Sequence, residues 1–105
     1  MTQNKFSGQL YDLIIKAENG DPGDIDFIMQ NLNSESTFAM TRFVDFSLGL
    51  VTNKKGIAQI EYYLFNGSQV QRNYSSLFFN RRGDWQIVQK AFKLGLIDEI
   101  QAFAR

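Results

Sequence analysis

Carboxylate and basic side chains carry most of the chemistry that this sequence offers, because its 105 residues include no histidine and no cysteine. Cysteine nucleophiles, histidine bases and the Ser-His-Asp triad are therefore excluded. Disulfides within the chain and zinc sites built from cysteine and histidine are excluded as well. The sequence also lacks the glycine patterns of nucleotide-binding phosphate loops.

Two sets of acidic residues need an explanation. Asp21, Asp24 and Asp26 stand close enough together to suggest a Ca²⁺ or Mg²⁺ site, but their spacing does not fit an EF-hand loop. Carboxylates at a helix start stabilise its free N–H groups, so we expect a helix start and no metal. Glu61, beside Tyr62, would be a catalytic base if it were buried, and we expect it to be exposed. We therefore expect no cofactor and no enzyme activity, since catalysis usually needs several cooperating groups.

A basic-aromatic pattern over residues 70–82 is the main candidate binding site. On a helix, Arg72, Phe79 and Arg82 lie toward the same side. Arginine grips phosphate or carboxylate with paired hydrogen bonds, and an exposed phenylalanine can stack on a base. Alternatively, Phe79 packs against a neighbouring helix and both arginines are solvated. The candidate site comprises Arg72, Phe79, Arg81, Arg82, Lys54 and Lys55, and Lys90 could extend it.

Four larger aromatic residues are candidate anchors for a protein partner. Tyrosine and tryptophan dominate the energetics of protein interfaces, but a small core uses the same residues. If several of them are exposed together, they indicate a partner surface. The four are Tyr62, Tyr63, Tyr74 and Trp85.

The elements that position these residues read as helices. Apolar residues recur at helical spacing from Phe6 to Ala17, and signals that end or begin a helix follow near residues 20, 33, 53, 67, 83 and 95. Ser68 and Gln71 fit a capping box, and Gly83 and Asp84 read as a helix end and a helix start. The sequence therefore predicts one all-α domain over residues 1–105, with six to seven short helices in layers.

An α+β fold is the alternative. Ile60, Tyr62 and Leu64 also alternate as in a strand, and the dipeptide Asn66-Gly67 favours a hairpin turn. Residues 58–79 would then form paired strands in a C-terminal β-meander, with a ligand pocket beneath the sheet. The capping box and the helical spacing of residues 70–78 favour the all-α fold.

The stretch Gly20-Asp21-Pro22, followed by apolar residues at helical spacing up to Leu32, resembles the opening of a bacterial HEAT-type repeat. The resemblance covers residues 20–32 only, and no second copy follows at a fixed period. It implies paired helices stacked in layers, an architecture commonly used to bind proteins or nucleic acids. It assigns no functional residue.

Charge divides the chain into unlike halves, although its net charge is zero. Residues 1–52 carry three basic and seven acidic residues, and residues 53–105 carry eight basic and four acidic ones. This asymmetry permits an acidic partner, a nucleic acid or head-to-tail self-association. The N-terminus has no apolar signal region and no run is long enough to span a membrane, so we expect a cytoplasmic protein.

These observations together predict a small, non-catalytic interaction module that binds a protein partner or itself. The first alternative is a binder of nucleic acid or another anionic ligand, which would use the basic-aromatic residues. The second is a pocket protein or an enzyme, which requires the α+β fold.

Overall fold

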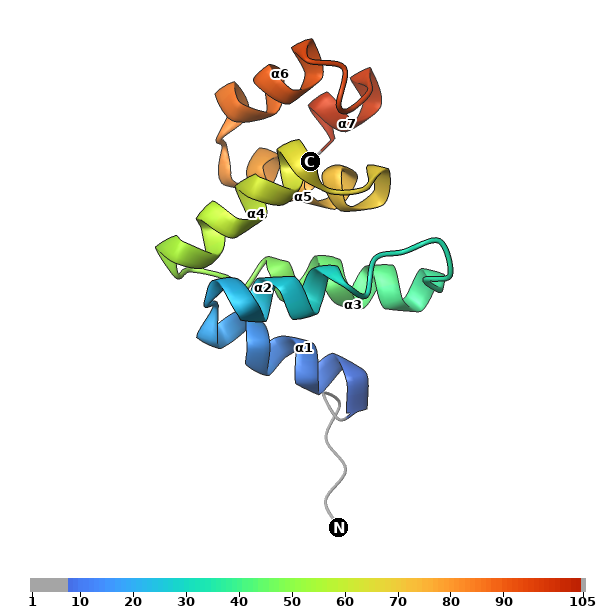
Figure 1. Cartoon of the computed structure of the whole chain (residues 1–105), viewed down its shortest axis with the longest axis vertical. Coiled ribbons are helices and arrows are strands. Elements are labelled where there is room, and N and C mark those ends of the chain that lie inside the picture. The colour runs from blue at the N-terminus through green and yellow to red at the C-terminus, as the bar shows by residue number, and fades with distance from the viewer. Residues whose placement is uncertain (1–7, 105) are drawn as a thin grey trace. The chain divides into compact units, whose positions relative to one another are not determined.

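The computed structural model describes residues 8–104, and these residues form seven α-helices and no strand. Residues 58–66 and 69–79 lie in two of these helices, so the all-α prediction is confirmed and the β-meander is wrong. Phe6 lies outside the described residues. The helices, shown in Figure 1, are α1 (Gly8–Asn19), α2 (Pro22–Met29), α3 (Phe38–Leu48), α4 (Lys54–Asn66), α5 (Gln69–Arg82), α6 (Trp85–Lys93) and α7 (Glu99–Phe103).

The chain divides into two compact units between Gln59 and Ile60, inside α4. The prediction of a single domain stays a prediction. None of the helices in the described part of the chain has the length and apolar character needed to cross a membrane.

In the first unit, α1 packs against both α2 and α3. The helices begin and end where local signals place them. Pro22 opens α2, and the Thr37 hydroxyl accepts a hydrogen bond from the Met40 N–H at the start of α3. Each helix turns its apolar stripe inward, as the spacing predicts. The fully buried apolar side chains of these three helices include Leu13, Ala17, Ile25, Ile28, Met29, Val44 and Leu48.

The start of α4 is fastened tightly to the turn between α1 and α2. A Cβ atom on Gly56 would lie 2.2 Å from the carbonyl oxygen of Gly20, so only glycine fits there. Gly20 itself has a positive φ of 69°, a conformation that favours glycine. The Asn53 side chain donates hydrogen bonds to the Asn19 carbonyl oxygen at 3.2 Å and to Asp21 Oδ1 at 3.1 Å. A close backbone contact and the Asn53 hydrogen bonds therefore hold the start of α4 against the turn between α1 and α2.

In the second unit, α5 packs against α6 and α7. Ser68 and Gln71 form the predicted capping box at the start of α5, and Gly83 ends that helix in the left-handed conformation. The buried Asn80 side chain donates hydrogen bonds to the carbonyl oxygens of Gln101 at 3.1 Å and Ala102 at 3.2 Å. These bonds tie the short α7 to α5 and satisfy carbonyl groups at the C-terminal end of α7.

Candidate interaction surface

The residues of the predicted basic-aromatic site are divided between the two units. Lys54 and Lys55 lie exposed in the first turn of α4, in the first unit. Arg72, Phe79, Arg81 and Arg82 lie on α5, in the second unit.

The prediction that Phe79 is an exposed anchor is wrong, because only 3% of the residue is accessible. Its ring meets the ring of Phe78 edge-on, with 5.1 Å between the centroids. Two further helices, α6 and α7, pack on α5 and bury side chains on more than one of its faces. The alternative interpretation, a core phenylalanine, is the correct one.

Arg72 is a structural clamp rather than a solvated side chain. Its guanidinium donates to the Leu96 carbonyl oxygen at 2.7 Å, the Gly67 carbonyl oxygen at 2.8 Å and Gln69 Oε1 at 2.9 Å. The guanidinium thus joins the loop before α5 to the loop after α6. These bonds use three of the five N–H donors of the guanidinium, and two of them go to backbone carbonyl oxygens, so Arg72 is engaged within the fold.

The end of α5 keeps its two remaining arginines at the surface. Arg82 pairs with Asp84, with 2.8 Å between Nε and Oδ2, and its guanidinium lies 5.6 Å from the Phe78 ring centroid. Arg81 is exposed. Because Arg82 is already engaged by a carboxylate and a ring, it contributes less free positive charge than the sequence suggests.

The three aspartates at the start of α2 all take part in hydrogen bonds within the fold. Asp24 accepts hydrogen bonds from the Asn19 side chain and from the Asp21 N–H at 3.1 Å, and Lys16 Nζ lies 3.7 Å from its carboxylate. The Asn19 hydrogen bond, helped by the other two contacts, holds the pKa of Asp24 below its ordinary value.

Across the described residues, no group of three acidic, histidine or cysteine side chains is placed to hold a metal ion. Glu61 is exposed on α4, as predicted.

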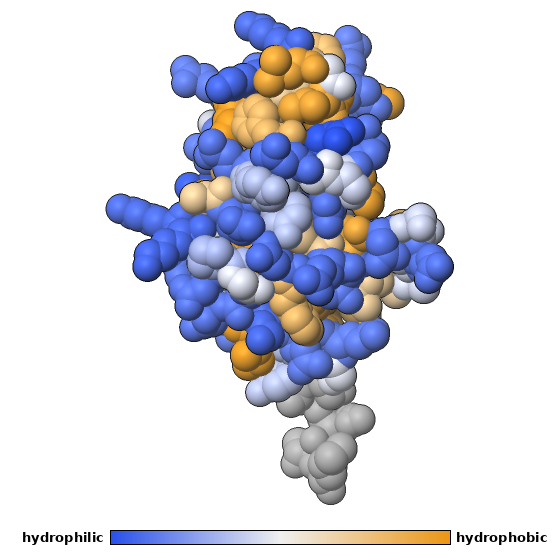
Figure 2. Space-filling model, in the orientation of Figure 1, coloured by the Kyte–Doolittle hydropathy of each residue, from blue (hydrophilic) through white to orange (hydrophobic). Residues whose placement is uncertain are grey.

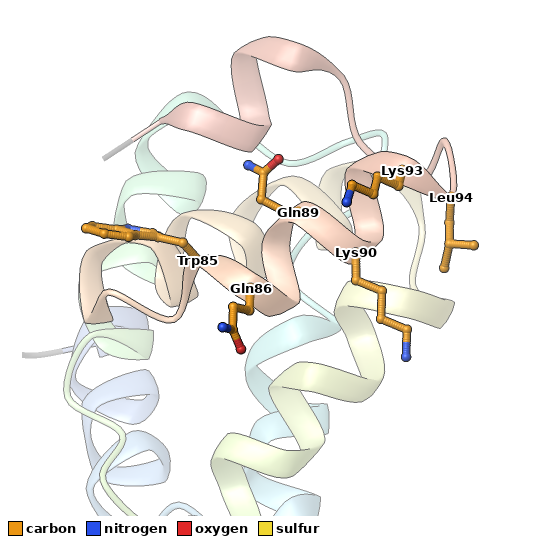
Figure 3. A pocket seen from close by; sticks show the side chains of 6 residues that line it. All are labelled: Trp85, Gln86, Gln89, Lys90, Lys93 and Leu94. Carbon is orange, nitrogen blue, oxygen red and sulfur yellow. The ribbon is translucent and has the colours of Figure 1, made fainter.

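One surface in the second unit does combine aromatic and basic groups. The outer side of α6 and the residue after it line a shallow hollow of about 510 Å³. Trp85 lies at the start of this helix, and two lysines and a leucine lie toward its end (Figure 3). We call this the α6 surface, and it comprises Trp85, Gln86, Gln89, Lys90, Lys93 and Leu94.

The side chains of the α6 surface differ in their exposure and in their contacts. The Trp85 indole donates to the Asn80 carbonyl oxygen at 3.3 Å, which holds the ring in place while 53% of the residue stays exposed. Lys90 Nζ lies 5.6 Å from the Phe65 ring centroid. Lys93 makes no hydrogen bond or ion pair with any residue that the structure describes. Leu94 is 61% exposed.

The chemistry of the α6 surface is apolar and positively charged. Its six lining residues include two lysines, two glutamines and no acidic residue. Exposed apolar side chains gather in this part of the chain, over α6 and α7 (Figure 2). Such a surface suits a partner that presents apolar side chains beside carboxylates or another anion.

The sequence predicts this surface only in part. It marks Trp85 as a candidate anchor and Lys90 as a candidate extension of the basic-aromatic site, and it singles out none of Gln86, Gln89 and Lys93. A helical wheel of residues 85–94 could have identified them, because Val88 and Ala91 are fully buried on the opposite side. Among the other candidate anchors, Tyr62 is 53% exposed, whereas Tyr63 and Tyr74 are half-buried.

A second hollow, of about 330 Å³, lies on α3 in the first unit. Phe38 is 78% exposed and Phe46 is 50% exposed, and the Arg42 guanidinium lies 5.8 Å from the Phe38 ring centroid. This hollow is lined by three phenylalanines, one alanine and one arginine, so it is more apolar than the α6 surface.

Compared with family models, curated proteins and solved structures, the chain matches none of them. The resemblance of residues 20–32 to a HEAT-type repeat therefore stays a prediction.

Proposed function

We propose that this chain is a small, non-catalytic interaction module that binds an acidic segment of a protein through the α6 surface. One observation carries the proposal: a fixed, half-exposed Trp85 shares a helix face with Lys93, which has no partner within the described residues. Aromatic side chains held in place lose little entropy on binding, and unpaired lysines attract carboxylates. The partner would place apolar groups on Trp85 and Leu94 and carboxylates near the lysines.

The non-catalytic part of the proposal rests on the side chains that the sequence supplies. The chain has no histidine and no cysteine, Asp24 is engaged in a helix cap, and Glu61 is exposed on α4. A catalytic base usually works with other cooperating groups in a pocket, and Glu61 is exposed on α4.

Some of the residues that favoured nucleic-acid binding in the sequence are occupied within the fold. Phe79 is buried and Arg72 is committed to three acceptors, so two members of the predicted stacking and phosphate-binding set are occupied. The two lysines of the α6 surface could still attract a phosphate backbone. The experiment must therefore compare a peptide with an oligonucleotide.

Trp85 provides the assay, because it is the only tryptophan in the chain. We would titrate the protein with a short synthetic peptide of alternating glutamates and aromatic or branched apolar residues. A matched peptide with lysine in place of each glutamate and a single-stranded DNA oligonucleotide are the comparisons. The proposal predicts that the acidic peptide shifts Trp85 emission to shorter wavelength, since the indole leaves water, and that the basic peptide does not.

Two charge reversals complete the test. Lys93→Glu turns an attraction into a repulsion and should weaken peptide binding about tenfold, which corresponds to about 1.4 kcal/mol. Lys55→Glu changes the net charge equally at an exposed site outside the α6 surface and should leave binding unchanged. Equal binding of both peptides, or equal effects of both variants, would contradict the proposal. Binding of the oligonucleotide alone, with a steep dependence on salt, would favour the nucleic-acid alternative.

A further inference from the structure

The outer side of α1 carries a stripe with the opposite character to the α6 surface. Tyr11 and Ile15 are each 45% exposed, and they lie one helical turn apart. Asp12 and Glu18 are exposed beside them and form no hydrogen bond or ion pair with any described residue. We call Tyr11, Asp12, Ile15 and Glu18 the α1 stripe. It offers two apolar side chains and two carboxylates.

The α1 stripe and the α6 surface complement each other in charge and in apolar character. The stripe contains two acids and no base, and the α6 surface contains two bases and no acid. The same division runs through the whole sequence, whose first half is net acidic and whose second half is net basic. Opposite charges on two faces of one chain favour contact between different copies, whereas two identical faces would repel each other.

The two surfaces also agree in length and in the order of their side chains. From Tyr11 through Ile15 to Glu18 the helix rises roughly 10 Å, and from Trp85 through Gln89 to Lys93 it rises roughly 12 Å. Laid side by side in the same direction, the two helices bring an aromatic residue to an aromatic residue at one end. At the other end, Glu18 meets Lys93.

We infer that the partner of the α6 surface is the α1 stripe of a second copy of this chain. This inference rests on the proposed function and names the acidic segment that it requires. Each copy has one stripe and one α6 surface, so the contact is head-to-tail and leaves an unused surface at each end of the pair. Association then extends into short chains with rising concentration rather than stopping at a closed dimer.

Sedimentation velocity over a range of protein concentrations tests the inference. In low-salt buffer the average mass should rise above the 12.1 kDa of one chain as concentration increases. In about 1 M salt, where the Debye length is about 3 Å, it should fall back toward one chain. Glu18→Lys places a lysine opposite Lys93, and Lys93→Glu places a glutamate opposite Glu18. Each change should raise the apparent dissociation constant at least about tenfold.

Variants that restore the ion pair between residues 18 and 93 give the decisive test of the inference. The double variant Glu18→Lys/Lys93→Glu recreates the ion pair with its charges reversed, and an equal mixture of the two single variants does the same between copies. Both should regain association. Glu35→Lys and Lys55→Glu make matched charge changes at exposed residues outside both surfaces and should associate like the original chain. Glu18 lies in the last turn of α1, where a lysine suits the helix dipole, so this variant should fold.

The outcomes separate this inference from the proposed function. A chain that stays at one-copy mass at every concentration overturns the inference, as does Glu18→Lys that associates like the original. If the acidic peptide still shifts Trp85 emission under those conditions, the proposed function stands with a different partner. If neither self-association nor the peptide shift is seen, both fail. A third result is that Lys93→Glu weakens association and Glu18→Lys does not. The α6 surface would then contact some other part of a second copy, which also overturns the inference.

Discussion

Replacing Arg72 by alanine distinguishes most sharply between a clamp and a ligand-binding arginine. The guanidinium bonds the carbonyl oxygens of Leu96 and Gly67 and the side chain of Gln69. A hydrogen bond from a charged donor contributes about 1.5–3 kcal/mol to stability, less where water can replace it. The bond to Gln69 is exposed and the two carbonyl bonds are partly buried, so we count only the carbonyl bonds. Arg72→Ala should then cost about 3 kcal/mol.

Urea unfolding followed by far-UV circular dichroism and by Trp85 emission measures this cost. Trp85 lies in the same unit as Arg72, so its emission reports on the affected part of the chain. A loss of about 3 kcal/mol corresponds to a fall in melting temperature of roughly 15 °C for a domain of this size. Arg72→Lys keeps the positive charge but lacks the planar set of guanidinium donors. It should therefore restore less than half of the unfolding free energy that Arg72→Ala loses.

If Arg72 is a clamp, its loss should not affect ligand binding. At temperatures where Arg72→Ala remains folded, its α6 surface should bind the acidic peptide as the original chain does. A loss of stability below about 1 kcal/mol, together with weaker peptide or oligonucleotide binding, would refute the reasoning. Arg72 would then be a ligand residue, as the sequence pattern first suggested.

Three further changes test the fold at single residues. Phe79→Ala should lower the unfolding free energy measured in urea by about 3–5 kcal/mol, because the side chain is buried. A near-neutral effect would contradict the burial of Phe79. Gly56→Ala should destabilise the chain, although alanine favours helices by about 1 kcal/mol, because its Cβ would meet the Gly20 carbonyl oxygen; a stabilised variant would contradict that contact. The pKa of Asp24 is lowered by the Asn19 hydrogen bond in the folded chain, so the stability it contributes is present above the pKa of the unfolded chain and is lost as pH falls below about 4. Asp24→Asn should flatten the dependence of unfolding free energy on pH in that range, and an unchanged curve would count against the cap.

The helices could be predicted because their boundaries depend on nearby residues. Ser68 and Gln71 cap α5 through bonds that span three residues, and Gly83 ends it in a conformation that glycine adopts without strain. The same local signals favour helices over a β-meander for residues 58–79. Both predictions depend on residues close together in the sequence and not on how the helices pack.

The binding site could not be predicted to the same degree, because exposure and pairing depend on distant parts of the chain. Phe79 is buried on α5, against which the later helices α6 and α7 pack, and the Arg72 clamp includes Leu96, which is 24 residues away. A helical wheel of residues 70–82 contains neither fact. Trp85 was recognisable by its type, but its value as an anchor depends on the bond to Asn80 that holds its ring.

Backbone amide NMR of the isotope-labelled chain, titrated with the acidic peptide, tests the central claim most directly. We predict chemical-shift changes concentrated in residues 84–94, with the Trp85 indole N–H among the largest, and their loss in Lys93→Glu but not in Lys55→Glu. Changes concentrated instead on the α3 hollow between Phe38 and Phe46, or on the arginines at the end of α5, would contradict the claim that the α6 surface is the binding site.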